Sequence, residues 1–147
     1  MTTSATRPAP PVLVYDGDCG FCTRSAGVAR RFVMPAGGTV AASYDLDLDA
    51  FGLTMAECME ALQFVDSRGR VHAAQDAVAH LLLAGAPWWK PLGAVLLVPG
   101  LNTVAGVLYR AVARNRYRLP GGTAACAMPS PSQQPSQQEP HEPERAA

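Results

Sequence analysis

Hydrophobic and polar residues follow two different periods along the chain, and each change of period marks an expected element. Residues 11–15 (PVLVY) form a short, partly β-branched apolar run that stops at Asp16-Gly17, which predicts a buried strand entering a tight turn. From Cys19 onward, apolar residues recur at helical spacing until Pro35 breaks the pattern. The chain is therefore predicted to begin with a strand that leads into an amphipathic helix.

The later segments continue this alternation of strands and helices. Residues 39–44 predict a second strand, and Thr54 with Glu57 has the spacing of a capping box that opens a short helix. Residues 62–72 predict a β-hairpin with a four-residue turn. Further helices are expected at residues 75–84, 91–98 and 102–117. This order indicates an α/β domain with a small mixed sheet flanked by helices and a C-terminal helical extension.

The boundary between the last two of these helices is expected at Pro99-Gly100, because proline and glycine interrupt helices. We therefore expect these two residues to separate the helices and to belong to neither.

The composition is that of one globular domain with polar ends. Of 147 residues, 48% are hydrophobic and 16% are charged, which supplies both a core and a solvated surface. Residues 1–11 and the Pro/Ser/Gln/Glu-rich residues 129–147 are expected to be disordered, so residues 12–128 form the predicted domain. No apolar run is typical of a signal peptide or reaches the roughly 18 residues of a membrane span. We therefore expect a cytoplasmic protein with no transmembrane segment.

Charge is unevenly distributed, although the formal net charge is zero. Residues 45–76 hold seven acidic residues, whereas residues 77–138 hold five basic residues and no acidic one. Three of these, spaced four residues apart, predict a basic stripe: Arg110, Arg114 and Arg118. Such a stripe can receive nucleic acid or anionic lipid, but a solvated helix face is the more frequent reason for it. We therefore expect no nucleic-acid partner.

A long apolar stretch, residues 92–109, follows the pair Trp88-Trp89. Stretches of this kind dock on a protein or a membrane in some proteins. More often they pack against the sheet of their own domain, because burial there removes apolar surface from water. We therefore expect this stretch to be packed.

Two cysteines, Cys19 and Cys22, fall in the first turn of the first predicted helix, within the stretch VYDGDCGFC. Positions i and i+3 lie on one helix face, at a separation that a disulfide accepts. The leading cysteine meets unpaired backbone N–H groups and the positive end of the helix dipole, which both favour a thiolate. We therefore predict thiol-disulfide exchange in which Cys19 attacks a disulfide and Cys22 resolves the mixed disulfide.

Carboxylates next to the pair act against the thiolate. The helix dipole contributes about 0.3 to 1 kcal/mol, and a carboxylate about 4 Å away in water opposes it by about 1 kcal/mol, so the net effect stays open. Asp18 directly precedes the helix and is expected to be its N-cap. Asp16 is expected either to relay a proton to Cys22 or to bond nearby N–H groups as a turn former.

Two further residues are accessory candidates. The N–H of Gly20 is an expected partner of the Cys19 thiolate, and Cys126 is a candidate to cap or resolve an oxidised Cys19. No cofactor is expected, and protein or small-molecule thiols and disulfides are the expected substrates.

Other roles for the pair remain open. A zinc site needs four ligands, and the other cysteines and histidines stand singly: Cys58, Cys126, His72 and His80. A structural disulfide closing so short a loop stabilises by only about 2 kcal/mol, and cytosolic glutathione tends to reopen it. A third alternative is a protein-interaction module with non-catalytic cysteines. Exchange is nevertheless the best-supported reading, because close Cys-x-x-Cys pairs in a reducing compartment are usually catalytic or metal-binding.

A family resemblance supports this prediction. The stretch YDGDCGFC, followed by residues 115–119 (NRYRL) and 126–129 (CAMP), resembles the bacterial DCC family of predicted thiol-disulfide oxidoreductases, also called DUF393 or YuxK-like. The resemblance spans about residues 12–129 and implies a thioredoxin-like fold. It places Asp16, Cys19 and Cys22 at the family's motif positions and matches Cys126 to its C-terminal cysteine.

One departure from thioredoxins concerns the substrate groove. Thioredoxins usually carry a cis-proline just before the third strand, whereas residues 61–64 contain no proline. We therefore expect substrate binding to differ from that of a thioredoxin.

Overall fold

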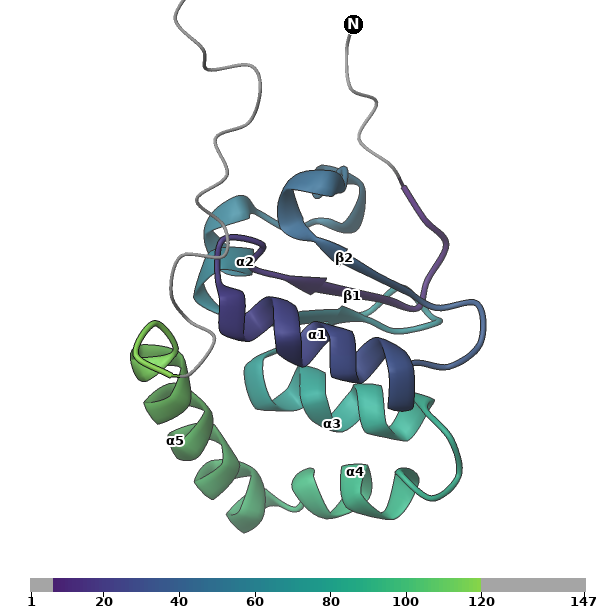
Figure 1. The fold of residues 1–147 in the computed structure, drawn as a ribbon. Coiled ribbons are helices and arrows are strands. Elements are labelled where there is room, and N and C mark those ends of the chain that lie inside the picture. The colour runs from purple at the N-terminus through teal and green to yellow at the C-terminus, as the bar shows by residue number, and fades with distance from the viewer. Residues whose placement is uncertain (1–6, 120–147) are drawn as a thin grey trace, which may run out of the picture.

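The computed structural model describes residues 7–119, which form a four-stranded sheet and five α-helices (Figure 1). The strands are β1 (Val12–Tyr15), β2 (Thr39–Ala42), β3 (Gln63–Val65) and β4 (Val71–Ala73). The helices are α1 (Gly20–Phe32), α2 (Met55–Glu60), α3 (Ala74–Ala84), α4 (Lys90–Leu96) and α5 (Pro99–Asn115). Two short 3-10 helices, η1 (Ser43–Asp45) and η2 (Asp49–Phe51), lie between β2 and α2. The predicted order of elements is confirmed.

Strand directions identify the fold. The sheet has the order β2-β1-β3-β4. β1 runs parallel to β2, a connection that requires a crossover, and α1 supplies it. β3 runs antiparallel to both β1 and β4, with Phe64 opposite Leu13 on one side and His72 on the other. This mixed sheet with helices on its faces is a thioredoxin-like α/β arrangement, which confirms the expected fold class.

The core consists of two apolar layers, one on each face of the sheet. Alternate residues of β1 enter different layers, because neighbouring side chains of a strand point to opposite faces. Val12 and Val14 pack with residues from η1 through α2, and Leu13 packs with Phe64 beneath α1 and α3. Figure 1 shows α1 and α3 together on one face of the sheet and α2 on the other.

Two predicted boundaries differ from the structure. Pro99 and Gly100 do not separate two helices but form the start of α5, with Pro99 as its first residue. Proline suits this position because its fixed φ is helical and its missing N–H has no partner there in any helix. The second strand ends at Ala42, since Ser43 begins the 3-10 helix η1.

Four calls reach beyond the described residues: the N-terminal segment at residues 1–11, the end of the domain at residue 128, the tail at residues 129–147, and Cys126. The prediction that residues 92–109 pack on the sheet is wrong, because that sheet face is already covered by α1 and α3. α4 instead packs on α3, where a Cβ at Gly93 would lie 2.7 Å from the carbonyl oxygen of Ala79. Valines and leucines of α4, α5 and the link between them stay between 47% and 66% exposed: Leu92, Val95, Val98, Leu101, Val104, Val107 and Leu108.

Within residues 7–119, no single helix is both long and apolar enough to cross a bilayer. α4 and α5 reach the required length and composition only as a pair, and they meet at a bend of 90°.

Candidate active site

Cys19 is the N-cap of α1, which corrects the prediction that Asp18 holds this position. Its backbone is extended, and its Sγ accepts a hydrogen bond of 3.2 Å from the N–H of Cys22. Asp18 instead belongs to the preceding turn, where its N–H donates to Oδ1 of Asp16 at 3.0 Å. The turn between β1 and α1 is therefore one residue longer than the sequence suggested. The first sulfur therefore lies where a capping oxygen normally lies.

The chemistry of this position favours negative charge on Cys19. A helix N-terminus presents unpaired N–H groups and the positive end of the dipole, so an acceptor that carries charge gains most there. The donor to the sulfur is the N–H of Cys22, and the accessory role expected for Gly20, the first residue of α1, stays a prediction. The geometry provides a backbone hydrogen-bond donor for the sulfur of Cys19 at a helix N-terminus.

Asp16 is buried beneath the pair, with 3% of its surface exposed. Its Oδ1 accepts the N–H of Asp18, which is the turn-forming contact that the sequence suggested as one of two roles. Its Oδ2 lies 3.1 Å from Nη2 of Arg116. Among the described residues no donor is aligned for a hydrogen bond to Oδ2, so this contact is an ion pair by distance alone.

Arg116 was missed as a site residue. It lies just after α5, and its side chain is only 13% exposed. Nη2 donates to the carbonyl oxygen of Met59 at 2.6 Å and to Oη of Tyr117 at 3.1 Å, while Nη1 lies 3.9 Å from Sγ of Cys22. The one signal in the sequence was the NRYRL stretch of the family resemblance. The fold brings it to the cysteines across 94 positions of chain.

The two cysteines differ in accessibility. Cys19 is fully buried, whereas Cys22 is partly exposed, and both are reduced. Burial raises the pKa of Cys22 to about 12, and the hydrogen bond with Cys19 and the charge of a Cys19 thiolate act in the same direction. The positive charge of Arg116 opposes this increase. In the reduced state, Cys22 is therefore a thiol at neutral pH.

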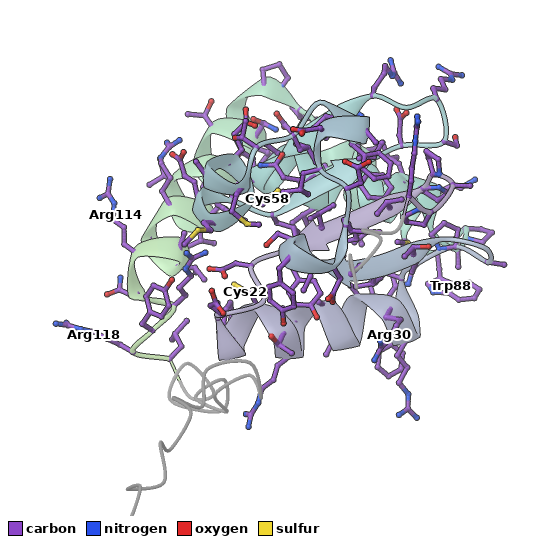
Figure 2. The ribbon with its side chains drawn as sticks, turned by 90° about the horizontal axis from the view of Figure 1, so that it is seen from above. Cys22, Arg30, Cys58, Trp88, Arg114 and Arg118 are labelled. Carbon is purple, nitrogen blue, oxygen red and sulfur yellow. The ribbon has the colours of Figure 1, made fainter. Side chains whose placement is uncertain are left out.

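An apolar groove of about 470 Å³ begins at Cys22. It runs between α1, α3 and α5, and apolar side chains from all three helices line it, among them Val28, Leu81 and Leu108. Cys22 and its charged neighbours Asp16 and Arg116 border the groove, while Cys19 does not. Figure 2 shows Cys22 at the start of α1, on the side of the molecule where α5 lies. A molecule in the groove therefore meets the second sulfur, not the first.

One wall of this groove is fixed to the sheet by a tyrosine. Oη of Tyr109, on α5, accepts the N–H of Leu62 at 2.9 Å, just before β3 begins. Burial raises the pKa of Tyr109, so the hydroxyl remains protonated at neutral pH. The contact holds α5 beside the cysteines without filling the space between the helices.

Other ligand chemistry has less support. Within residues 7–119 there is no group of three or more His, Cys, Asp or Glu side chains placed to hold a metal ion. Cys58 is fully buried in the core, and burial raises its pKa to about 11. The structure adds no support to the metal-site alternative.

A thioredoxin-like sheet that delivers a Cys-x-x-Cys pair to a helix N-terminus defines the class of thiol-disulfide oxidoreductases. The comparison with family models agrees: residues 13–122 match the DCC1-like thiol-disulfide oxidoreductase family. The chain belongs to this family, as the resemblance in its sequence implied. No curated protein and no solved structure matches it.

Proposed function

We propose that this protein catalyses dithiol-disulfide exchange in the cytoplasm, using Cys19 and Cys22 as the redox couple. The observation that carries the proposal is that the two sulfurs have different environments. Sγ of Cys19 is buried against the N–H of Cys22 at a helix N-terminus, while Cys22 borders an apolar groove. One sulfur accepts a backbone hydrogen bond at a helix N-terminus, and the other is accessible to a substrate.

The accessibility of the two sulfurs supports catalytic roles that differ from the sequence-based prediction. Starting from the oxidised pair, a substrate thiolate in the groove attacks Sγ of Cys22. The Cys19–Cys22 bond breaks, and a bond between the substrate and Cys22 forms. Cys19 leaves as a thiolate, held by the N–H of Cys22 and the dipole of α1. A leaving sulfur that is stabilised in this way lowers the cost of the step.

The second half of the reaction releases the product. A second substrate thiolate attacks the substrate sulfur of the mixed disulfide, so the substrate leaves as a disulfide and Cys22 leaves as a thiolate. Cys22 then takes a proton, because its pKa in the reduced protein is about 12. Two electrons pass from two substrate thiols to the pair. In reverse, Cys22 loses its proton and attacks a substrate disulfide, and Cys19 resolves the mixed disulfide on Cys22.

Arg116 supports these steps through its charge. Its guanidinium lies 3.9 Å from Sγ of Cys22, so it stabilises negative charge on that sulfur when the mixed disulfide is cleaved. Asp16 acts as a positioning residue, because its buried carboxylate is paired with Arg116. The alternative role of Asp16 as a proton relay stays a prediction.

Trapping distinguishes the two assignments. The variants Cys19→Ser and Cys22→Ser, each with Cys126→Ser, are incubated with oxidised glutathione and mapped by peptide mass. If substrates enter at Cys22, the Cys19→Ser variant accumulates a mixed disulfide on Cys22, while the buried Cys19 of the other variant reacts slowly. The reverse pattern would restore Cys19 as the attacking residue.

A redox titration tests the couple itself. The full-length protein is equilibrated in glutathione and dithiothreitol buffers, alkylated and weighed. A reversible two-electron transition between about −270 and −120 mV, the span of known oxidoreductases, is expected. Absence of a Cys19–Cys22 disulfide at every potential would contradict exchange and favour an interaction module with non-catalytic cysteines.

A further inference from the structure

The outer side of α4 and α5 forms an apolar surface that no part of the described chain covers. Monomeric soluble proteins rarely expose a contiguous apolar surface of more than a few hundred Å² unless it binds something. Here six valines and leucines on two consecutive helices and the link between them are each 47% to 63% exposed. We call this the α4–α5 face, and its members are Leu92, Val95, Val98, Leu101, Val104 and Val107.

Basic residues border this face, and acidic residues are absent from this part of the chain. Residues 77–119 contain five basic residues and no acidic one: Lys90, Arg110, Arg114, Arg116 and Arg118. Arg116 is engaged in the active site, but Arg110, Arg114 and Arg118 are exposed. Figure 2 shows Arg114 and Arg118 pointing away from the body of the domain. The surface is therefore apolar with a positive border.

The acidic residues lie mainly elsewhere. Six of the seven in residues 45–76 come before α3, in the segment from η1 through the hairpin. In Figure 1 that segment lies on the sheet and on its opposite side from α4. In α2, the carbonyl oxygen of Met59 accepts a hydrogen bond from Arg116, which directly follows α5. The charge of the molecule is thus polarised, although its formal net charge is zero.

The order of residues on α5 matches a helix that lies in a membrane interface. Leu101, Val104 and Val107 follow one another at intervals of three, so they lie along one side of the helix. Arg110 and Arg114 continue from Val107 at intervals of three and four. Arginine side chains beside an apolar stripe lay their stems along it and keep the charge in the headgroup region.

Aromatic residues stand at both ends of the two-helix extension. Trp88, before α4, is 72% exposed, and Tyr117, after α5, is 50% exposed. Tryptophan and tyrosine prefer the boundary between headgroups and acyl chains, because one end of each side chain is apolar and the other is polar. Both ends of the extension are therefore suited to that boundary.

We propose that the α4–α5 face docks the protein on the surface of a membrane that contains anionic lipid. Two copies of the chain meeting through this face would bring their arginines together, so the charges disfavour self-association. An anionic bilayer satisfies both features at once, since it accepts apolar side chains and attracts the basic border. The docking does not depend on the exchange chemistry, because no member of the face is an active-site residue.

Vesicle binding tests the proposal on the full-length chain. The probes are phosphatidylcholine vesicles with and without phosphatidylglycerol, and binding is followed by co-sedimentation and by tryptophan fluorescence. We expect binding to the anionic vesicles, weakening as salt increases. Equal binding to both kinds of vesicle, or none to either, would overturn the proposal.

Substitutions on the face supply the specific test. The double variant Val104→Asp, Val107→Asp places two acids in the centre of the face, and we expect it to lose at least about tenfold in affinity for anionic vesicles. Val71→Asp, at a valine of β4 that is 40% exposed, is the matched control and should bind as the parent does. If the control loses as much affinity, the α4–α5 face is not the docking surface.

A second pair of variants tests the charges without adding acids to the face. Each basic residue near an anionic surface is worth about fivefold in affinity, so Arg110→Gln, Arg114→Gln should lose about twenty-five-fold. Arg30→Gln, Arg68→Gln removes the same charge elsewhere; Figure 2 shows Arg30 pointing from a different side than Arg114. Equal losses in both double variants would indicate attraction without a defined face.

Light scattering and redox titration complete the design. If light scattering shows a dimer that dissociates in Val104→Asp, Val107→Asp, the face is a contact between copies. That result would overturn the membrane assignment. The redox transition of Cys19 and Cys22 should be unchanged in all four variants. Loss of vesicle binding with an intact redox transition therefore separates the docking surface from the proposed exchange.

Discussion

The central strand and the last helix are both rich in apolar residues, yet they have opposite environments. Val12, Leu13 and Val14 of β1 are at most 1% exposed, whereas Val104 and Leu108 of α5 are 63% and 66% exposed. β1 is flanked by strands on both edges and covered on both faces. α5 meets the rest of the domain along one side only, because α1 and α3 already occupy the nearest sheet face. Burial stabilises any apolar segment, but the topology of the fold determines which apolar segments are covered.

This difference separates the tasks of the two regions. The buried region fixes the cysteines, since β1 ends at Tyr15, just before Asp16, and α1 begins after Cys19. The exposed region contributes Arg116, one wall of the groove and a free apolar face. The buried part holds the cysteine pair, and the incompletely covered part carries the surfaces where we propose that substrates and a membrane bind.

The largest expected effect contrasts the two environments directly. Phe64→Ala removes a fully buried ring that packs with Leu13 and Leu81, and should lower the free energy of unfolding by about 3 to 5 kcal/mol. Val104→Ala removes an exposed side chain and should change it by less than about 0.5 kcal/mol. Urea denaturation measures both. A cost at Val104 similar to that at Phe64 would show that α5 is covered in the folded protein.

A smaller effect tests where the two regions are joined. A Cβ at Gly93 would lie 2.7 Å from the carbonyl oxygen of Ala79, so Gly93→Ala should force α4 away from α3 and cost about 1 to 3 kcal/mol. Gly100→Ala makes the same chemical change in the first turn of α5, where no described atom lies within 4 Å of the added carbon. It should stabilise by up to about 1 kcal/mol, because alanine favours helix. Thermal unfolding of the two variants in opposite directions would support the packing of α4.

Much of the fold follows from local patterns. The strand at residues 11–15, the capping box at Thr54 and the hairpin at residues 62–72 all occur as predicted, because each depends on residues close in sequence. The prediction that residues 92–109 pack on the sheet was wrong, because such packing depends on which other helices already cover that sheet face. Hydrophobic periodicity shows that a helix has an apolar side but does not show whether a partner is available for it.

The site was predictable in its cysteines and not in their environment. A Cys-x-x-Cys pair at the start of a helix is a local signal, whereas Arg116 reaches Cys22 only through the tertiary fold. The relative accessibility of the sulfurs also depends on distant residues, since the groove that exposes Cys22 is walled by α5. The N-cap lies one residue later than predicted, because Asp is a usual capping residue whereas the capping atom here is the sulfur of Cys19.

The smallest expected effect on stability concerns the pH dependence of Cys22, which lies where the two regions meet. Its pKa is raised from 9.0 to about 12 in the folded protein, so above pH 9 the unfolded chain ionises while the folded protein does not. Stability should therefore decline as the pH rises from about 9 to about 12, by a small amount because the side chain is half exposed and screened.

The titration of Cys22 can be measured by its rate of alkylation, followed by mass spectrometry across this pH range. Thiolate formation at Cys22 should have its midpoint well above pH 9. In Cys19→Ser the midpoint should fall but stay above 9.0, since burial, the largest cause, persists. In Arg116→Gln it should rise, because the positive charge is lost. A midpoint near 9.0 in the parent protein would mean that Cys22 is more solvated than the groove allows, and the entry of substrates through the groove would lose its physical basis.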